Sequence, residues 1–296
     1  MRTTAAASGG APGEPTDPGD APKPSGIKAG RNLPAAAAVG VALVGGALLT
    51  LFTVKATFLI YMGLGLGIGL HELTGALRAR EIRIPFIPVL LGGAAMVTSA
   101  YWAAGGAVAA VFAITLIAIL AWRLPGGADG YVKDVTGAVF ATAYLALPGA
   151  TVAAMLTPAD GPRRVLTFVV LTIASDIGGY FAGITLGRGG AHKMAPTISP
   201  KKTWEGLAGS ALTVIVAGVV LFPVLLHGYW WQGAITGVAA VAAAVLGDLA
   251  ESMIKRDLGL KDMGSLLPGH GGVLDRLDSL VICAPVTWLL LAAFIR

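Results

Sequence analysis

The sequence predicts an all-α integral membrane protein, a polytopic bundle of about nine transmembrane helices. Hydrophobic residues make up 55% of the 296-residue chain, charged residues only 12%, and the mean hydropathy is +0.77. Soluble domains carry about twice this share of charge, so most of the chain is expected to face lipid. The 42 glycines agree with that expectation, because small residues allow transmembrane helices to approach one another closely.

The first 34 residues are expected to form a disordered cytoplasmic tail. They are rich in Ala, Gly, Pro and Ser and contain no aromatic residue, so they offer no face to bury. A cleaved signal peptide would place its apolar stretch directly after a charged N-terminus, whereas the first apolar stretch here begins near Pro34. The first span is therefore expected to stay in the protein, and residues 35–296 to form one membrane-embedded domain.

Apolar segments long enough to cross a bilayer follow one another from that point to the C-terminus. A helix needs roughly 17–25 residues to cross about 30 Å of hydrocarbon. Nine such segments are predicted, at residues 35–54, 56–76, 84–102, 106–122, 135–157, 165–186, 206–227, 231–250 and 279–295. The links at Lys55 and Gly105 are the least marked divisions between them.

The distribution of Lys and Arg predicts the orientation of these spans. Basic residues concentrate in the cytoplasmic loops of membrane proteins. With the N-terminus in the cytoplasm and the C-terminus outside, 17 of the 21 basic residues fall on the cytoplasmic side. The four that fall outside are Lys55, Arg163, Arg164 and Arg296. Basic residues that bind a substrate would raise the cytoplasmic count for a different reason.

Several classes of site and function are disfavoured by composition and motif content. The single cysteine, Cys283, cannot form a disulfide or a cysteine-based metal cluster within one chain. The net charge of +5 is small for nucleic-acid binding, and its basic residues flank apolar runs as membrane topology would place them. The sequence also lacks a Gly-x-Ser-x-Gly elbow, a Walker phosphate loop and a recognisable internal repeat.

The densest run of reactive groups lies between Gly247 and Ser279, after one predicted span and before the last. If the preceding helix continues through this boundary, one of its faces carries a series of polar residues, namely Asp248, Glu251, Ser252 and Lys255. Asp275 and Asp278 are three residues apart at the start of the final span, so their carboxylates can share a face as well. Two acidic helix ends are therefore expected to meet at the cytoplasmic side.

Carboxylates of this kind suit Mg²⁺, which takes one or two of them together with water and substrate phosphates. Matching cations for phosphate are supplied by Lys255, Arg256, Lys261 and Arg276. The turn at 268–272, Pro-Gly-His-Gly-Gly, contains glycines that would let backbone N–H groups approach an anion such as a triphosphate. The alternative is a connecting loop whose opposite charges neutralise one another near the lipid headgroups.

Polar residues elsewhere supply further candidates. Asp176 lies within an apolar span, where an ionisable side chain is costly unless it is paired or hydrated, so it is expected in or beside the site. Lys201 and Lys202 precede another span and suit either a phosphate-bearing ligand or ordinary interfacial anchoring. The glycines that follow Asp176 are expected to pack against a neighbouring helix. Glu72, near the end of the second span, suits either polar packing or a substrate contact, and packing is the favoured interpretation.

The chain resembles the phosphatidate cytidylyltransferases, also called CDP-diacylglycerol synthases. Their signature is filled here by Ser252, Lys255, Arg256, Lys261, Asp262, Pro268, His270, Gly271, Gly272, Asp275, Arg276 and Asp278. The Ser-Asp-x-x-x-Tyr run at 175–180 and the Ser-Pro-Lys-Lys-Thr-x-Glu-Gly run at 199–206 are similar to that family as well. Met263 and Gly179 are small departures, and residues 35–160 resemble the family only in their helix pattern.

The resemblance implies Mg²⁺-dependent transfer of CMP from CTP to phosphatidate, which yields CDP-diacylglycerol and pyrophosphate. It implies that 35–296 is a catalytic domain in the cell membrane with its active site facing the cytoplasm. It also implies metal binding by Asp248 and Asp275, and it allows a second, monovalent cation such as K⁺. The residues expected to act in catalysis are Asp248, Asp275, Asp278, Lys255 and Arg256. Those expected to bind substrate are Asp176, Lys201, Lys202, Ser252, Lys261, His270 and Arg276.

The expected partners are CTP, phosphatidate and membrane lipids, but not nucleic acid, and a homodimer is compatible with the glycine-rich spans. Two alternatives stay open at this point. Cytidylyl transfer to an ether lipid or an isoprenoid phosphate would use nearly the same residues. A cation or proton transporter would use Asp176 as an intramembrane relay, although the cytoplasmic run of acids and bases and the lack of a repeat disfavour it.

Overall fold

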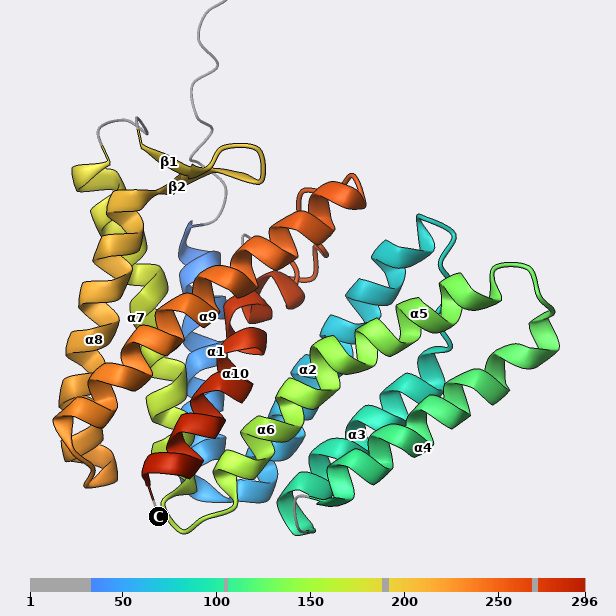
Figure 1. Cartoon of the computed structure of the whole chain (residues 1–296), viewed down its shortest axis with the longest axis horizontal. Helices are drawn as coiled ribbons and strands as arrows, with labels where there is room; N and C mark the ends of the chain where they lie inside the picture. The colour runs from blue at the N-terminus through green and yellow to red at the C-terminus, as the bar shows by residue number, and fades with distance from the viewer. Residues whose placement is uncertain (1–32, 104–105, 188–191, 268–270, 296) are drawn as a thin grey trace, which may run out of the picture.

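The computed structural model describes residues 33–103, 106–187, 192–267 and 271–295 (Figure 1). The predicted tail, residues 1–34, lies outside this part of the chain except for its last two residues, which begin the first helix. The disorder expected for the tail therefore stays a prediction.

Nine helical segments cross the described part of the chain, close to the nine spans predicted from the sequence. The fifth is a continuous rod in which a π-helical turn, η2, joins two α-helices. The segments are α1 (Leu33–Thr53), α2 (Lys55–Arg78), α3 (Phe86–Trp102), α4 (Gly106–Arg123), α5 (Tyr131–Ala141) with η2 (Thr142–Ala146) and α6 (Leu147–Leu156), α7 (Gly161–Leu186), α8 (Trp204–Leu226), α9 (Trp230–Asp257) and α10 (Leu274–Phe294). A 3-10 turn, η1 (Leu124–Gly126), follows α4.

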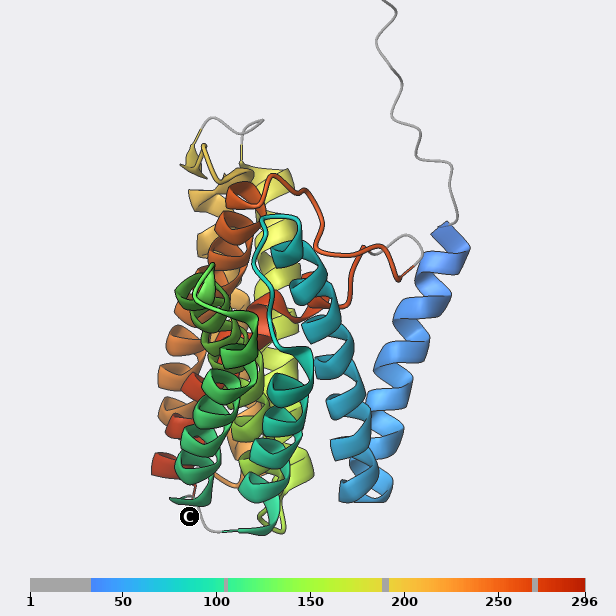
Figure 2. The same ribbon diagram turned by 90° about the vertical axis from the view of Figure 1, so that its right-hand side faces the viewer.

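These helices have the length and composition of membrane spans. Seven described helical stretches are long and apolar enough to cross a membrane, and two shorter apolar helices, 38–53 and 86–102, match the first and third predicted spans. Successive segments run in alternating directions, so the links between them gather at two opposite ends of the bundle (Figure 1, Figure 2). The protein is a polytopic helical membrane protein, as the sequence predicted.

The boundaries of the last two spans differ from the predicted ones in a way that matters for the site. The ninth-span prediction began at residue 279, but α10 begins at Leu274, so Asp275 and Asp278 both lie in its first turns. Helix α9 does not stop at residue 250 but continues to Asp257, where Gly259, at a φ of +71°, follows the end of the helix. Polar helical residues therefore extend past the apolar part of the span.

A two-stranded hairpin interrupts the otherwise helical architecture, and the sequence did not predict it. Strand β1 (Lys193–Ala195) pairs antiparallel with β2 (Ser199–Thr203) in the link between α7 and α8. Pro200 is tolerated in β2 because a two-stranded sheet leaves one edge of each strand without a ladder partner. Thr203 ends the strand and caps α8, since its hydroxyl oxygen accepts a hydrogen bond from Gly206 N–H at 3.1 Å.

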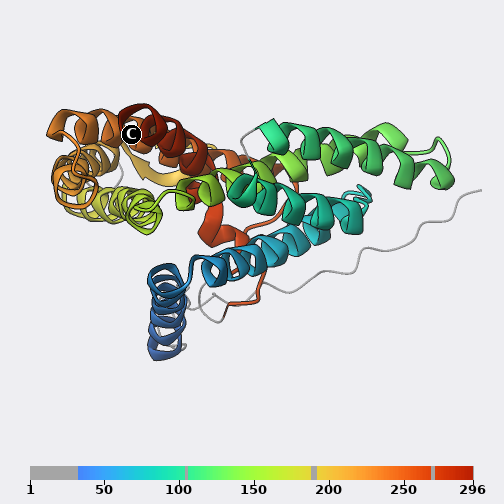
Figure 3. The same cartoon turned by 90° about the horizontal axis from the view of Figure 1, so that it is seen from below.

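Close packing of α7, α8 and α9 fixes the frame that carries the hairpin. A Cβ added at Gly178 of α7 would lie 2.8 Å from the carbonyl oxygen of Gly209 in α8. A Cβ added at Gly218 of α8 would collide with the carbonyl oxygen of Gly233 in α9. Only residues without a side chain permit these backbone contacts. Helix α10 packs against α9, α7, α6 and α2, whereas α1 lies at the margin of the bundle beside α2 (Figure 3).

Candidate active site

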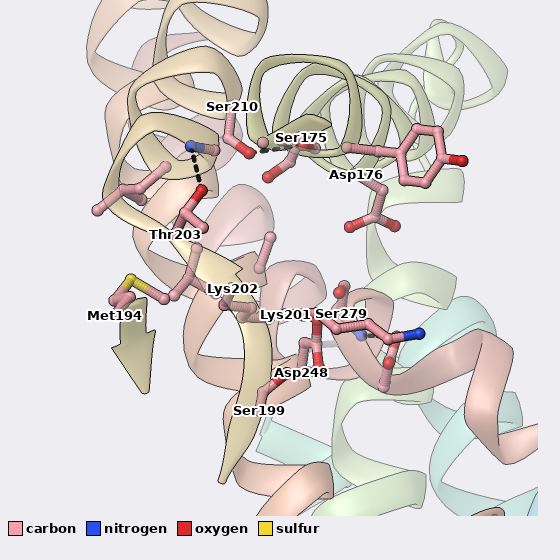
Figure 4. Close-up of a pocket in the computed structure, with 18 of the residues that line it drawn as sticks. Ser175, Asp176, Met194, Ser199, Lys201, Lys202, Thr203, Ser210, Asp248 and Ser279 are labelled. Atoms are coloured by element: carbon pink, nitrogen blue, oxygen red, sulfur yellow. Dashed lines mark hydrogen bonds and ion pairs between the residues drawn. The ribbon is translucent and has the colours of Figure 1, made fainter. Parts of the chain in front are cut away.

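A cavity of about 550 Å³ lies among α7, the hairpin, α9 and the start of α10 (Figure 4). Nine charged residues from these elements line it: Asp176, Lys201, Lys202, Asp248, Lys255, Asp262, Asp275, Arg276 and Asp278. Five carboxylates and four cations therefore face one space at the end of the bundle that carries the hairpin. Eight of these nine residues were predicted as site residues from the sequence.

Helix α9 supplies lining charges because it continues beyond the apolar part of its span. Asp248 and Lys255 are seven residues apart, on one helix face, and both line the cavity. Ser252 does not line it, but its hydroxyl donates a hydrogen bond of 3.3 Å to Asp248 Oδ1. Glu251 points into the protein: its side chain is fully buried, and Lys255 Nζ lies 3.2 Å from its Oε1.

An ion pair joins the hairpin to α9. Lys202 Nζ in β2 lies 2.6 Å from Asp248 Oδ2, and both side chains are partly buried. Figure 4 shows Lys201 and Lys202 on the strand beside Asp248, with Asp176 of α7 facing the same space. Strand β2 and helix α9 thus bring two predicted phosphate-binding lysines beside a predicted metal ligand, and α7 adds Asp176.

Asp275 is held by three donors at the start of α10. Its carboxylate accepts hydrogen bonds from Lys255 Nζ at 2.8 Å, Met263 N–H at 3.0 Å and Gly272 N–H at 2.9 Å. Only 5% of the side chain is exposed. Asp275 therefore ties the loop before α10 to α9 in addition to lining the cavity.

The glycine turn predicted to bind an anion is only partly within the described residues. Pro268, Gly269 and His270 lie outside them, so the role expected for His270 stays a prediction. The N–H group of Gly272, which ends this turn, donates to Asp275, and the N–H groups of the next two residues, Val273 and Leu274, donate to Glu72. The anion-binding role expected for the turn at 268–272 stays a prediction, although Asp275 already accepts the hydrogen bond of Gly272 N–H.

Two predicted phosphate-binding residues lie away from the cavity. Arg256 and Lys261 are exposed, and neither is among the residues that line it. Arg256 directly follows Lys255 on a helix, so the two side chains diverge instead of facing each other. The roles expected for Arg256 and Lys261 stay predictions.

Sequence reasoning missed three residues in or beside the site. Asp262 lines the cavity, and the signature run contained it next to Lys261. Glu251 was placed on the polar face of α9 but was not expected to be buried. The carboxylate of Glu72, on α2, lies against the start of α10, and its only signal in the sequence was an acidic residue inside an apolar span.

The chemistry of these donors fits a magnesium ion bound together with a nucleotide. Asp248 offers carboxylate oxygens and is the more accessible of the two predicted ligands, with 34% of its side chain exposed. Among the described residues, no group of three or more His, Cys, Asp or Glu side chains is arranged to hold a metal by itself. Mg²⁺ characteristically keeps water and phosphate ligands, so one or two carboxylates are enough.

The chain matches proteins of known activity over most of its length. Residues 35–294 match the family model described as the cytidylyltransferase family. A phosphatidate cytidylyltransferase of Mycobacterium leprae (strain TN) is 36% identical over 281 residues, which cover 89% of each chain. One from Mycobacterium bovis is 38% identical over 278 residues, 89% of this chain and 90% of the relative.

A further phosphatidate cytidylyltransferase, from Haemophilus influenzae, is 43% identical over a shorter stretch of 133 residues. It covers 43% of this chain and 45% of that relative. The family resemblance read from the signature residues is thereby confirmed. The match of the whole membrane-spanning region, together with the charged cavity, shows that the chain belongs to the cytidylyltransferase family.

Proposed function

We propose that this protein is a phosphatidate cytidylyltransferase, an enzyme that transfers CMP from CTP to phosphatidate. The products are CDP-diacylglycerol and pyrophosphate. The observation that carries the proposal is the cavity itself, where Asp248 of α9 meets Lys202 of β2 and Lys255 of α9 meets Asp275 of α10. Its charges suit anionic phosphates, and the relatives of matching length bear this name.

The cavity can serve a soluble and a lipid substrate at once. Asp248 and Lys255 lie where α9 passes from apolar to polar residues, near the level of the lipid headgroups. The apolar residues Leu207, Ala244 and Val245 also line the cavity, beside Asp176. Phosphatidate can therefore present its phosphate while its acyl chains remain in the bilayer, and CTP enters from the aqueous side.

The reaction is a single displacement at the α-phosphorus of CTP. A phosphate oxygen of phosphatidate forms the new P–O bond, and the bond to pyrophosphate breaks with its electron pair leaving on pyrophosphate. The attacking phosphate is already an anion, so no strong general base is required. Lys201 and Lys202 are assigned to the lipid phosphate, and Lys255 and Arg276 to the phosphates of CTP.

This assignment requires Lys202 and Lys255 to exchange their carboxylate partners for substrate phosphates. In the structure Lys202 and Lys255 each neutralise a carboxylate, at 2.6 Å from Asp248 and 2.8 Å from Asp275. Binding of phosphates would draw these ammonium groups away from the carboxylates. Asp248 and Asp275 would then hold Mg²⁺, with Asp278 beside them. The metal, and any K⁺ that accompanies it, supplies positive charge that stabilises the charge developing on the phosphates.

The proposal also covers the setting of the enzyme. The active site faces the cytoplasm of a cell membrane, since the end of the bundle with the cavity carries most of the basic loops. A homodimer is included as well: Gly63 of α2 has no other atom within 4 Å of an added Cβ, so the helix is open to close packing at this point. The mass of the native protein in detergent tests whether it is a homodimer.

The direct test uses the purified protein with CTP, phosphatidate and Mg²⁺. CDP-diacylglycerol and pyrophosphate are expected in equal amounts, and removal of divalent ions should abolish both. Asp248→Asn is expected to lower kcat at least 100-fold, because it removes the charge that holds the metal. Asp129→Asn, at an exposed acidic residue on the link after α4, should leave the rate unchanged.

Other lipid acceptors give the test its second arm. A panel of diacyl, ether-linked and isoprenoid phosphates with radiolabelled CTP should show phosphatidate as the preferred acceptor. A strong preference for another phosphate lipid would keep the chemistry and reassign the substrate. Normal turnover by Asp248→Asn, or no CDP-lipid with any acceptor, would overturn the proposal.

A further inference from the structure

Glu72 connects the N-terminal half of the bundle to the start of α10. It belongs to α2 and is buried, with 9% of the residue exposed. Its Oε1 accepts a hydrogen bond from Val273 N–H at 3.0 Å, and its Oε2 accepts one from Leu274 N–H at 2.8 Å. A carboxylate at this place satisfies N–H groups that the helix itself leaves without partners and lies at the positive end of the helix dipole.

Two glycines of the loop before α10 close around the same carboxylate. A Cβ added at Gly272 would lie 2.6 Å from Glu72 Oε2, and one at Gly264 would collide with Glu72 Oε1. The loop can therefore pass over Glu72 only where it has no side chains. One carboxylate thus contacts the backbone of two loop segments and the first residues of the helix.

The residues that contact Glu72 are next in sequence to residues that hold Asp275, which lines the cavity. Gly272 N–H donates to Asp275, whose other donors are Met263 N–H and Lys255. The residues next to these donors, Val273 and Gly264, are the ones that contact Glu72. Any displacement of this loop would move the carboxylate of Asp275 and release its hold on Lys255, although Glu72 itself does not line the cavity.

We propose that Glu72 is a positioning residue for catalysis: its carboxylate sets the position of Gly264 and of the residues from Gly272 to Leu274, and through them the position of Asp275. The inference rests on the proposed function insofar as Asp275 acts in the reaction. It assigns a catalytic contribution to a residue that contacts neither substrate. Misplacement of a reacting geometry by about 1 Å can cost on the order of 100-fold in rate.

Glu72→Gln is the first test. The amide keeps one acceptor oxygen but turns an NH₂ donor toward the second backbone N–H. We expect kcat to fall about 10-fold to 100-fold, while KM for CTP and for phosphatidate changes less than about threefold, because Glu72 does not line the cavity. Hydrogen–deuterium exchange should become faster at Val273 and Leu274 and stay unchanged in α4. Glu81→Gln, an exposed acidic residue after α2, is the matched control.

A double-mutant cycle separates this role from general destabilisation. Gly264→Ala should lower kcat in the native protein, because its Cβ displaces Glu72, but should have little further effect in Glu72→Ala, where the carboxylate is gone. The control is Gly75→Ala, on α2 three residues after Glu72, where an added Cβ meets open space; this substitution should leave kcat unchanged.

The outcomes are distinct. Additive effects of Gly264→Ala and Glu72→Ala, or native kcat and native amide exchange in Glu72→Gln, would overturn the positioning role. A native protein that forms no CDP-lipid would overturn the proposed function instead, and amide exchange at Val273 and Leu274 in Glu72→Gln would still report whether Glu72 holds these residues.

Discussion

Lys255 is the residue on which most of the site's charge balance depends. Its ammonium group lies 2.8 Å from Asp275 and 3.2 Å from Glu251, whose side chain is fully buried. Within the described residues the two oxygens of Glu251 have no hydrogen-bond partner besides this ion pair. Lys255→Met should therefore destabilise the fold by about 3–5 kcal/mol, since it leaves a buried carboxylate without its cation. Thermal unfolding in detergent measures the loss.

A second substitution separates stability from catalysis at this position. Glu251→Gln in the Lys255→Met background removes the buried charge and should restore much of the unfolding temperature. Activity should stay low, because Asp275 and the phosphates of CTP have both lost their ammonium partner. Recovery of activity together with stability would show that Lys255 serves the fold alone.

Sequence reasoning at the residue scale succeeded where residues lie near one another in the chain. Asp248 and Lys255 were placed together by helical spacing, and Asp275 and Asp278 by the same rule. Glu72 was not found as a partner of the loop, because about 200 positions separate it from Val273 and no local pattern encodes that contact. Arg256 does not line the cavity beside Lys255, since adjacent helical residues point apart, and its expected role stays a prediction.

At the scale of elements, the contact between α7 and α8 sets the width of the cavity. Gly209 faces Gly178 so closely that an added Cβ would lie 2.6 Å from the carbonyl oxygen of Gly178. Gly209→Leu is expected to push the helices apart, lower the unfolding temperature and raise KM for phosphatidate. Gly65→Leu, which meets open space on α2, is the control and should do neither. Unchanged KM and stability in Gly209→Leu would contradict this packing.

The helices were predictable because a span needs a long apolar run, and that signal is strong. The hairpin between α7 and α8 was not, since the eight residues of its strands carry no alternation of apolar and polar residues: Lys201 and Lys202 are adjacent, and Pro200 is a strand breaker in most contexts. Its position depends on contacts made after folding, above all Lys202 with Asp248. The sequence did not predict that α9 continues past residue 250. It indicated only that Asp248 and Lys255 would share a helix face if the helix did continue.

At the scale of the molecule, the predicted orientation can be tested by cysteine labelling. Cys283 is fully buried, so the native protein should not react with a membrane-impermeant maleimide. Arg163→Cys, at the end of the bundle away from the cavity, should react in intact cells. Ala128→Cys, in the link between α4 and α5, should react only after the membrane is opened. The reverse pattern would invert the topology and place the cavity outside.

Helix α9 is a single rod of 28 residues, about 42 Å long, whereas the hydrocarbon layer is about 30 Å thick. The surplus is about two helical turns and carries Lys255, whereas Asp248, about 27 Å along the axis from Trp230, lies just inside the boundary of the hydrocarbon. The depth at which phosphates are exchanged is thus set by the distance from Trp230 at the far boundary to these turns. A bilayer with longer acyl chains would draw Asp248 deeper into the hydrocarbon. The thickness of the surrounding bilayer therefore influences how deep the site lies relative to the lipid headgroups.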